Sequence, residues 1–485
     1  MKRLVTACVA IVLSALLWFL GTGLHPLPCV AFLAPLPVLL LASRASGGVA
    51  FLAGLLSWLG GACQFWPYFT GTLEQPPVAP AALLGGTSVA FGLLVLLTRA
   101  LLVRNRPGLA LLALPVGWVT VEYLISVFGS IGAWWSLAYT QTDVLPVIQS
   151  AALTGPWGIT FLIMLPSSAI AVLTAPNVTR AQRLRLGSGT AALLTATLAF
   201  GYTRIALPTD SAAVRVGLVA LAQPDDYVPV DSAAGQDMVA RAVTEIERLV
   251  DQGAEVVVLP EKSWRATEST LPMLSGPLTE VAARRHTTVV AGLVLARPEA
   301  AVNAAIAYPS GVVYAKHYLI PGLEDELRPG TAWQQVPGTS WSLAICYDLD
   351  RPSLVRANRN RGATLMLVPA LDFTVDKWLH SRMAVLRGVE SGVGVARAAQ
   401  LGELVAGDAT GRVVASAATD TAHDRTVIAD IPQHTSATLY ARFGDWFGWL
   451  AAVLAAACAA AGFAPARRTA PAGAGSGTVR ARARR

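Results

Sequence analysis

The sequence predicts a multi-pass α-helical membrane domain of eight spans and an extracytoplasmic α/β domain inserted before the last span. Apolar residues make up 54% of the 485 residues, and charged residues make up only 14%, against about 25% in a typical soluble domain. The charges are also unevenly spread, because residues 1–207 hold only 13 of them. This composition excludes a disordered or fibrous protein and disfavours an ordinary soluble enzyme.

Eight apolar stretches approach the length of about 20 residues that a spanning helix needs. The first could instead be a signal peptide, but no good small-residue cleavage site follows it and six more spans come before residue 208. We therefore expect a seven-span membrane domain at 1–207, an α/β domain at 208–440, an eighth helix at 441–466 and a basic tail at 467–485. The predicted spans are Leu4–Leu20, Pro26–Leu41, Gly48–Tyr68, Pro80–Leu97, Leu109–Val127, Trp157–Leu173, Thr190–Ala206 and Trp446–Phe463.

Basic residues occupy alternate loops between these spans. The loops 21–25, 69–79 and 128–156 contain no Lys or Arg, so the positive-inside rule places the other loops and both termini in the cytoplasm and residues 208–440 outside. The net charge of +7 therefore indicates topology, with a possible contact to anionic lipid, rather than a nucleic-acid partner. The basic loops carry Arg44, then Arg99, Arg104 and Arg106, then Arg180, Arg183 and Arg185.

Strands and helices alternate in the soluble part, which favours a layered α/β architecture. Asp231 is a candidate N-cap for the first helix, and Gly253 is a candidate stop. The Pro-Ser-Gly at 309–311 predicts a hairpin turn. The predicted strands are Val214–Leu221, Glu255–Pro260, Thr287–Ala296, Asn303–Tyr308, Gly311–Lys316, Trp341–Ile345, Thr364–Val368 and a late strand near Gly411–Val414, and Leu278–His286 is a second helix.

Cys346 is a candidate nucleophile. The other four of the five cysteines lie in apolar stretches, so the α/β domain has a single thiol and no disulfide of its own. Such a cysteine can also be simply a small buried hydrophobe. Cys346 follows the apolar run WSLAI, however, and reacting groups gather at the carboxyl ends of strands in α/β domains.

Two charged residues also stand at strand ends. Glu261 directly follows the buried strand EVVVLP, where partial desolvation suits a general base; a solvated strand-end acid is the alternative. Lys316 ends another strand in a chain that has only four lysines among 37 basic residues. It is either a snorkelling strand-end cation or a site that needs a compact ammonium. Glu324 follows eight residues later in a loop.

The predicted membrane domain contributes polar and aromatic candidates. Trp134, Trp135, Tyr139 and Gln141 lie in an outer loop and form either an interfacial aromatic belt or a wall that guides lipid beneath the α/β domain. Glu122 lies inside a span, where a carboxylate usually faces the bundle interior. It is either a structural hydrogen-bonding group or part of a path for a lipid head group.

These motifs together resemble a known family. The LPE of Glu261, the K-x-x-L-I-P-x-x-E of Lys316 to Glu324 and the C-Y-D of Cys346 resemble the Glu-Lys-Cys triad of the nitrilase superfamily. Eight spans with the domain before the last resemble the bacterial apolipoprotein N-acyltransferases. GAWWSLAYTQ at 132–141 and the GxxG-containing stretch Gln149–Ile163 are similar to that family's membrane motifs.

The resemblance implies an αββα sandwich and transfer of an acyl chain from a phospholipid, through a cysteine thioester, to the N-terminal amine of a diacylglyceryl-cysteine apolipoprotein. It implies no metal and no organic cofactor, and it places the protein in the bacterial cytoplasmic membrane. The implied catalytic residues are Glu261, Lys316 and Cys346, supported by Glu324, Tyr347 and Asp348, with substrate binding by Trp134, Trp135, Tyr139, Gln141 and Trp264.

The sequence departs from the family pattern at three places, which leaves the acceptor open. Asp348 stands where the family usually has Glu, Ala370–Phe373 replaces S-N-D-x-W-F, and Arg397–Gly402 replaces R-A-T/S-N-x-G. A membrane-tethered carbon–nitrogen hydrolase with the same triad and a catalytically silent scaffold are the rival functions. No spacing singles out a histidine as a partner of Cys346, and no Cys/His/Asp cluster has metal-ligand spacing.

Overall fold

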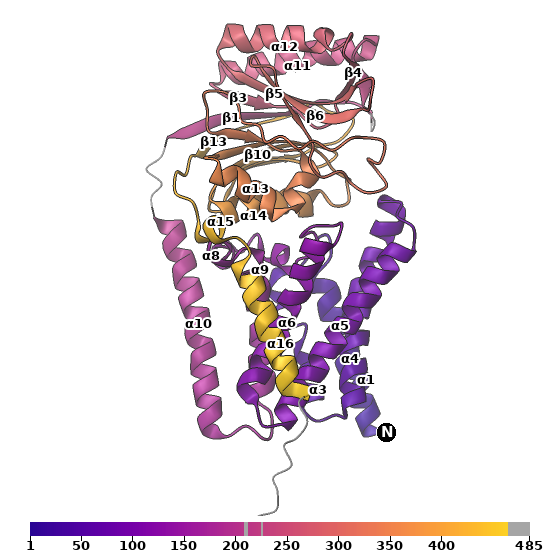
Figure 1. Ribbon diagram of the computed structural model, residues 1–485, viewed down its shortest axis with the longest axis vertical. Coiled ribbons are helices and arrows are strands. Elements are labelled where there is room, and N and C mark those ends of the chain that lie inside the picture. The colour runs from indigo at the N-terminus through magenta and orange to yellow at the C-terminus, as the bar shows by residue number, and fades with distance from the viewer. Residues whose placement is uncertain (208–211, 225–226, 464–485) are drawn as a thin grey trace, which may run out of the picture.

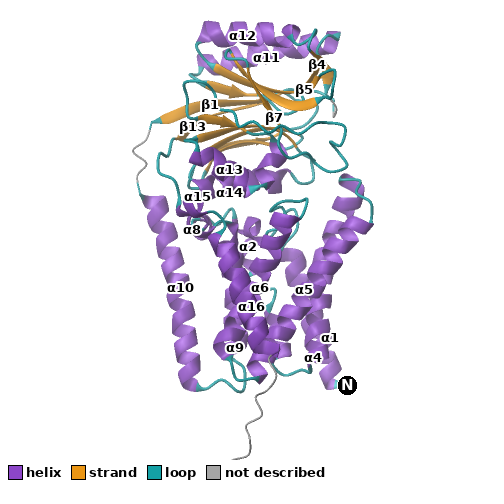
Figure 2. Ribbon diagram, viewed as in Figure 1, coloured by secondary structure: helices purple, strands orange, loops and turns teal. Residues whose placement is uncertain are grey.

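The structure is a computed structural model that describes residues 1–207, 212–224 and 227–463. A bundle of long helices forms one half of the molecule, and a layered α/β domain covers one end of it (Figures 1 and 2). The N-terminus lies at the opposite end of the bundle. The predicted basic tail at 467–485 falls outside the described residues.

Within the described residues, six helices are long and apolar enough to cross a membrane: α1, α4 with the turns that follow it, α5, α6, α9 and α16. The helical elements of the bundle are α1 (Lys2–Gly21), α2 (Pro28–Ala31), α3 (Leu36–Ala42), α4 (Gly47–Ala62), η1 (Cys63–Phe65), η2 (Tyr68–Thr72), α5 (Val78–Val103), α6 (Pro107–Phe128), η3 (Leu137–Gln141), α7 (Leu145–Ile148), α8 (Ala151–Thr154), α9 (Pro156–Leu173), α10 (Arg180–Ala206) and α16 (Trp446–Phe463).

The second and seventh predicted spans differ from expectation. The stretch Pro26–Leu41 forms the two short helices α2 and α3, because Pro35 and Pro37 interrupt a continuous helix there. The seventh lies on α10, a 27-residue helix that begins ten residues early, with a capping box between Thr179 and Gln182. Gly and Thr residues dilute its apolar stretch, so α10 is not among the six.

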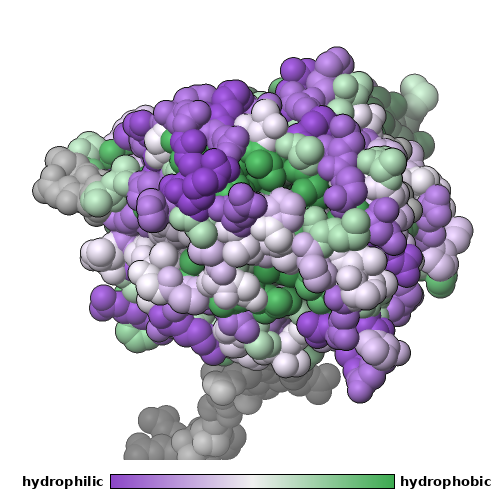
Figure 3. Space-filling view, turned by 90° about the horizontal axis from the view of Figure 1, so that it is seen from above, coloured by the Kyte–Doolittle hydropathy of each residue, from purple (hydrophilic) through white to green (hydrophobic). Residues whose placement is uncertain are grey.

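Large apolar side chains are exposed along the bundle. Leu4, Val12, Val89, Leu193 and Val453 are each more than two-fifths exposed, as expected for helices that contact lipid. The far face of the α/β domain is largely hydrophilic or neutral, with smaller hydrophobic patches between (Figure 3).

The α/β domain has two sheets stacked face to face. The first has β1, β3 and β5 side by side and parallel, with β13 antiparallel to β1 at one edge and the β6–β7 hairpin beyond β5. The second runs β12-β11-β10-β9-β8, in which β8, β9 and β10 are parallel. The strands are β1 (Ala213–Ala220), β2 (Val228–Pro229), β3 (Val256–Val258), β4 (Trp264–Thr267), β5 (Thr288–Ala296), β6 (Val302–Tyr308), β7 (Val312–Ala315), β8 (Trp341–Leu343), β9 (Leu365–Leu371), β10 (Gly394–Gln400), β11 (Glu403–Gly407), β12 (Val413–Ala418) and β13 (Arg425–Pro432).

Helices cover both outer faces, which gives the αββα sandwich. The helices are α11 (Ala233–Asp251), α12 (Pro272–Arg285), α13 (Pro352–Asn360), α14 (Lys377–Ser391) and α15 (Leu439–Phe443). Side-chain alternation along β1 builds two layers of core, because Val216 and Leu218 face the second sheet whereas Val219 packs in the layer of α11 and α12. The layer of α13 and α14 faces the membrane bundle (Figure 1).

One predicted cap is wrong by a residue. Ser232, and not Asp231, is the N-cap of α11, and its hydroxyl accepts a hydrogen bond from the Gly235 N–H at 3.0 Å. Both residue types suit this position, so the local pattern alone does not choose between neighbours. The helix ends at Asp251, two residues before Gly253.

Candidate active site

Three strand ends bring Glu261, Lys316 and Cys346 to one region between the two sheets. Glu261 follows β3, Lys316 directly follows β7, and Cys346 opens the short helix η4 (Cys346–Asp350) after β8. Lys316 Nζ donates to Glu261 Oε1 and to Glu324 Oε2, both at 2.8 Å. The Lys316 and Glu261 side chains are 1% and 2% exposed, so this contact is shielded from water.

Asn303 and Lys262 also bind the carboxylates of this cluster. Asn303 on β6 donates from Nδ2 to Glu261 Oε1 at 2.5 Å and to Glu324 Oε1 at 2.8 Å. Lys262 pairs with Glu324 Oε1 at 2.7 Å. Two ammonium groups thus balance two carboxylates, as buried charges require. The sequence analysis placed Asn303 at the start of a predicted strand but missed Lys262, although the position of Lys262 next to Glu261 was a usable signal.

Electrostatics keep Lys316 charged. Burial by itself would lower the pKa of the Lys316 ammonium, but the carboxylates of Glu261 and Glu324 hold that pKa well above its usual value. Burial likewise opposes ionisation of Glu324, yet Lys316 and Lys262 lower the pKa of Glu324 to about 2. Glu324 therefore holds Lys316 as a permanent ion-pair partner.

Cys346 lies beside this cluster without a hydrogen bond to it. Its Sγ donates to the Leu371 carbonyl oxygen at 3.5 Å, and among the described residues no hydrogen bond links that sulfur to Glu261 or Lys316. The same residue, Leu371, donates its N–H to Glu261 Oε2 at 2.9 Å. The Cys346 thiol and the Glu261 carboxylate therefore bind the same residue at the end of β9, the thiol at its carbonyl and the carboxylate at its N–H.

The surroundings of Cys346 favour the neutral thiol over the thiolate. Burial, and next the nearby Glu261, raise the pKa of the Cys346 thiol well above its usual value, while Lys316 acts in the opposite direction. The backbone of Cys346 has a φ of +41°, a left-handed conformation that is uncommon for a residue other than glycine and that clusters at functional sites.

Asp348 joins the two strand ends that carry Lys316 and Cys346. Its Oδ1 accepts from the N–H groups of His317 and Tyr318, and its Oδ2 accepts from the Ile345 N–H and the Tyr314 hydroxyl, at 2.7 to 3.1 Å. All four bonds are made although this side chain is shorter than the Glu usual in the family. Asp348 is thus a positioning residue.

The turn that carries Cys346 also docks onto the membrane bundle. The Tyr347 hydroxyl donates to the Ser130 carbonyl at 2.6 Å. Arg351 donates to the carbonyls of Ser126, Gly129 and Ser130 at the end of α6. The bundle therefore fixes the position of the nucleophile.

A cavity of about 360 Å³ opens next to the sulfur and is lined by Cys346, Tyr347, Leu371, His380, Met383 and Arg397, among others. His380 was not singled out from the sequence, since no spacing marked it. It lies 3.3 Å from Asp372 and 3.6 Å from Asp376, and Asp372 is also paired with Arg397. Two of the three departures from the family pattern, the segments 370–373 and 397–402, thus contribute residues to this wall.

The predicted substrate-binding residues separate into three groups. Trp134, Trp135 and Tyr139 are buried and line a second cavity beneath α14. Gln141 is buried but donates to the Pro28 carbonyl and to Thr140, which is a structural arrangement. Trp264 lies fully buried on β4 in the layer of α11 and α12, so the structure does not bring it to this site.

Glu122 has a full set of hydrogen-bond donors. It accepts from Trp118 Nε1, Ser136 Oγ, the Leu137 N–H and Thr160 Oγ1 at 2.7 to 3.0 Å. These contacts favour the structural interpretation, in which Glu122 anchors the aromatic loop to α6 and α9. Within the described part of the chain, no group of three or more His, Cys, Asp or Glu is arranged to hold a metal ion.

Two protein families match most of the chain. The apolipoprotein N-acyltransferase N-terminal domain matches residues 14–169, and the carbon–nitrogen hydrolase domain matches residues 215–440. The chain belongs to the apolipoprotein N-acyltransferase family, within the nitrilase superfamily. A relative named apolipoprotein N-acyltransferase, from Geobacter metallireducens, is 33% identical over 153 residues, which are 30% of this chain and 29% of that protein. The chain thus matches under a third of that curated relative's length.

Solved structures of an amidase are similar to part of this apolipoprotein N-acyltransferase family member. An amidase from Nesterenkonia sp. is 22% identical, with a TM-score of 0.39 over 46% of this chain and 91% of that chain. A mutant of that amidase, with the acetamide moiety of fluoroacetamide added covalently at its active-site cysteine, is 21% identical, with a TM-score of 0.40 over 49% of this chain and 96% of that chain.

Proposed function

We propose that this protein transfers an acyl chain from a phospholipid, through a thioester on Cys346, to the N-terminal amine of a diacylglyceryl-cysteine apolipoprotein. The two matched families support this function, and so does the buried cluster of Cys346, Glu261 and Lys316. Glu261, Lys316 and Cys346 are the proposed catalytic residues, Glu324, Tyr347 and Asp348 their support, and no metal or organic cofactor takes part.

The observation that carries the proposal is a lateral groove that joins the membrane bundle to the loop between Lys316 and Glu324. The groove lies between the outer ends of α5 and α6, and its roof is the loop Pro321–Leu323 of the α/β domain. Apolar side chains dominate its bundle side, including Leu83, Leu124 and Phe128. A substrate that enters here comes from the lipid side of the bundle and meets the loop that runs from Lys316 to Glu324, which favours a lipid ester.

In the first half reaction, Cys346 is acylated. The thiol turns from the Leu371 carbonyl to Glu261, which takes its proton while the sulfur attacks the ester carbonyl carbon. Lys316 Nζ stabilises the oxyanion of the tetrahedral intermediate; removal of such a donor typically lowers the rate about 100- to 1000-fold. The carbon–oxygen bond then breaks, Glu261 returns the proton to the leaving lysophospholipid oxygen, and a thioester remains.

In the second half reaction, the acceptor amine attacks the thioester carbonyl. Glu261 takes a proton from the amine, Lys316 again stabilises the oxyanion, and the carbon–sulfur bond breaks. The proton passes to the departing sulfur, which restores the thiol and leaves the acyl chain in an amide. The lysophospholipid leaves before the amine reacts, and the acyl chain stays on Cys346 in between, so the chemistry is ping-pong.

The groove and the site distinguish the proposed function from its two rivals. A membrane-tethered carbon–nitrogen hydrolase would use the same three residues on a soluble amide, and one anchoring helix would suffice for it. A silent scaffold would have no need to keep a buried ammonium between two carboxylates, an arrangement that is costly to desolvate. The lateral groove and the docking of η4 onto the bundle both favour a lipid substrate.

The membrane arrangement is part of the proposal. We infer eight spans, with α10 and the α2–α3 pair added to the six long apolar helices, and an α/β domain at 208–440 that precedes a last span at 441–466. The positive-inside rule then places the termini and the tail 467–485 in the cytoplasm and the active site at the outer face of the bacterial cytoplasmic membrane. Membrane lipid surrounds the bundle, and no nucleic acid is a partner. Labelling of a cysteine introduced at exposed Glu280 by a membrane-impermeant maleimide in intact cells tests this orientation.

The function is tested with purified protein, phospholipid and a diacylated lipopeptide. Mass spectrometry is expected to detect a fatty-acyl thioester on Cys346 when phospholipid is supplied alone, and one added acyl chain on the peptide amine when both are supplied. The Cys346→Ser variant is expected to yield neither while it still inserts in the membrane. Full activity of that variant would refute the nucleophile, and amide hydrolysis without a fatty-acyl thioester would identify the hydrolase instead.

A further inference from the structure

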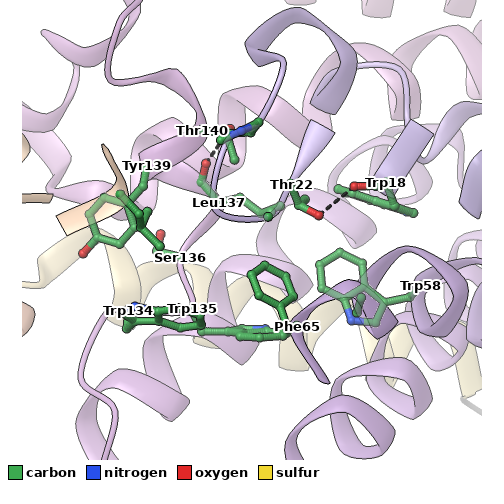
Figure 4. Close-up of a pocket in the computed structure, with 14 residues that line it drawn as sticks. Trp18, Thr22, Trp58, Phe65, Trp134, Trp135, Ser136, Leu137, Tyr139 and Thr140 are labelled. Atoms are coloured by element: carbon green, nitrogen blue, oxygen red, sulfur yellow. Dashed lines mark hydrogen bonds between the residues drawn. The ribbon is translucent and has the colours of Figure 1, made fainter. Parts of the chain in front are cut away.

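A second cavity lies inside the bundle beneath the α/β domain. We call it the tryptophan cavity, because Trp18, Trp58, Trp134 and Trp135 line it together with Phe65 and Leu379. Figure 4 shows the rings of Phe65 and Trp58 facing the segment that carries Leu137 and Thr140. An apolar lining with few polar groups is typical of small-molecule sites.

The tryptophan cavity is close to the proposed active site. Leu379 of α14 lines it, and Met383, one helical turn further along, lines the cavity that holds Cys346. Leu379 and Met383 also belong to the same buried apolar cluster as Trp134 and Trp135. One turn of α14 therefore links the lining of the tryptophan cavity to the lining of the cavity that holds the Cys346 sulfur.

Two hydrogen-bond donors of the lining have no protein acceptor. The indole N–H groups of Trp18 and Trp135 are buried and make no hydrogen bond within the described residues, and both residues are more than nine-tenths buried. The neighbouring hydroxyl oxygens already accept other hydrogen bonds, Thr22 Oγ1 from Gln64 Nε2 and Thr140 Oγ1 from Gln141 Nε2. Each hydroxyl also donates to a backbone carbonyl, Thr22 to that of Trp18 and Thr140 to that of Leu137 (Figure 4). A buried N–H without a partner is costly, so these indoles favour a ligand that offers an acceptor oxygen.

We propose that the tryptophan cavity binds one fatty-acyl ester arm of a lipid substrate. The hydrocarbon chain packs among the aromatic rings, and the ester carbonyl oxygen accepts from the indole N–H of Trp135 or Trp18. This inference rests on the proposed function and adds a specificity site to it. Two sources share this chemistry: the acyl arm that the phospholipid donor keeps, and an ester arm of the diacylglyceryl acceptor.

A larger side chain in the tryptophan cavity tests whether the cavity binds a fatty-acyl chain. Ala62 lines it at the end of α4, so Ala62→Phe shortens the space for a chain. The control is Val89→Phe, which adds the same ring at a side chain that is 43% exposed on α5. The two half reactions are measured separately, with mixed-chain phospholipids that vary only the retained arm, and with acceptors that vary the diacylglyceryl arms from 8 to about 16 carbons.

In one half reaction, Ala62→Phe is expected to lower kcat/KM for 16-carbon arms at least about tenfold relative to 8-carbon arms, while Val89→Phe follows the wild type. The half reaction that changes identifies the source of the arm. An unchanged chain-length profile in both half reactions would overturn the proposal, and so would an equal loss at every chain length. If the wild type forms no thioester, the proposed function itself has failed.

A binding measurement is independent of catalysis. Lipids brominated on the long arm are expected to quench tryptophan fluorescence in the wild type and less in Ala62→Phe; equal quenching in both would contradict the site. Trp135→Phe keeps an aromatic ring, although a smaller one, and removes the donor. It is expected to raise KM roughly three- to tenfold for an ester arm and to leave KM unchanged for an ether arm, which has no carbonyl. Equal effects on both arms would exclude the hydrogen bond from Trp135, and equal effects in Trp18→Phe as well would exclude the hydrogen bond altogether.

Discussion

The backbone of Gly132 packs against the carbonyl oxygen of Asp350, so that the aromatic loop of the bundle touches the turn that carries Cys346. Gly132 has a φ of +58°, and a Cβ at this position would overlap that oxygen. The next residue, Ala133, donates its N–H to the same oxygen at 2.8 Å. A position that needs both a left-handed backbone and close approach accepts only glycine.

Gly132→Ala is therefore expected to loosen the docking of the nucleophile turn. The left-handed backbone alone costs about 1–2 kcal/mol with a side chain, and the overlap adds to it. We expect a lower Tm in detergent and slower acylation of Cys346, measured by thermal unfolding and by mass spectrometry of the thioester. Gly86→Ala on α5 is the control, because its Cβ would meet no atom within 4 Å; an equal effect of both variants would contradict the docking role.

Glu261→Gln is expected to change thiol ionisation and acyl transfer in opposite directions. Loss of the negative charge beside Cys346 lowers the pKa of the thiol, because Glu261 helps to raise it, so the pH profile of Cys346 alkylation shifts to lower pH. Acylation by phospholipid slows about 100- to 10,000-fold, because the general base is gone.

The control for that experiment is Glu280→Gln, on the exposed side of α12. It is expected to leave both the alkylation profile and the acylation rate unchanged. Wild-type acylation in Glu261→Gln would remove Glu261 from the role of base.

Asp348→Asn is expected to weaken the connection between the Lys316 loop and the Cys346 turn. The amide nitrogen cannot accept, so two of the four hydrogen bonds of the buried carboxylate are lost, at a cost of about 3 kcal/mol in the free energy of unfolding. The Tm and the acylation rate are both expected to fall. Asp237→Asn, at a side chain that is 70% exposed, is expected to change neither, and an Asp348 variant with wild-type Tm would show that this clamp is dispensable.

We predict that the protein loses stability at alkaline pH, where His380 loses its proton. Burial alone would lower its pKa, but Asp376 and Asp372 raise the pKa of His380 to about 9. Because the folded-state pKa is raised above the unfolded value of about 6.5, the stabilisation is fully present below pH 6.5 and is lost as pH rises through 9. The Tm of the wild type is expected to fall between pH 7 and 10, and that of His380→Gln to fall less; parallel curves would show that His380 does not carry the effect.

The three proposed catalytic residues and their order along the chain could be predicted from the sequence, because strand ends are local features. Glu261, Lys316 and Cys346 each follow a recognisable apolar run, and each lies where its strand ends. The break of the second predicted span was also visible in principle, since Pro35 and Pro37 cannot continue a helix. Trp264 was misleading for the opposite reason: it is close to Glu261 in sequence, but its strand turns the side chain into the layer of α11 and α12.

By itself, the sequence determined the apolar helices, the alternating strands and helices and the residue types of the triad, because these depend on local periodicity and composition. Only the tertiary structure decided that the thiol rests on the Leu371 carbonyl, that Lys262 balances Glu324, and that His380 faces the Cys346 cavity. Only it placed the indoles of Trp18 and Trp135 without acceptors. Each of these contacts joins residues whose packing or side-chain direction depends on how two sheets and a helical bundle fit together, and no short-range pattern encodes that fit.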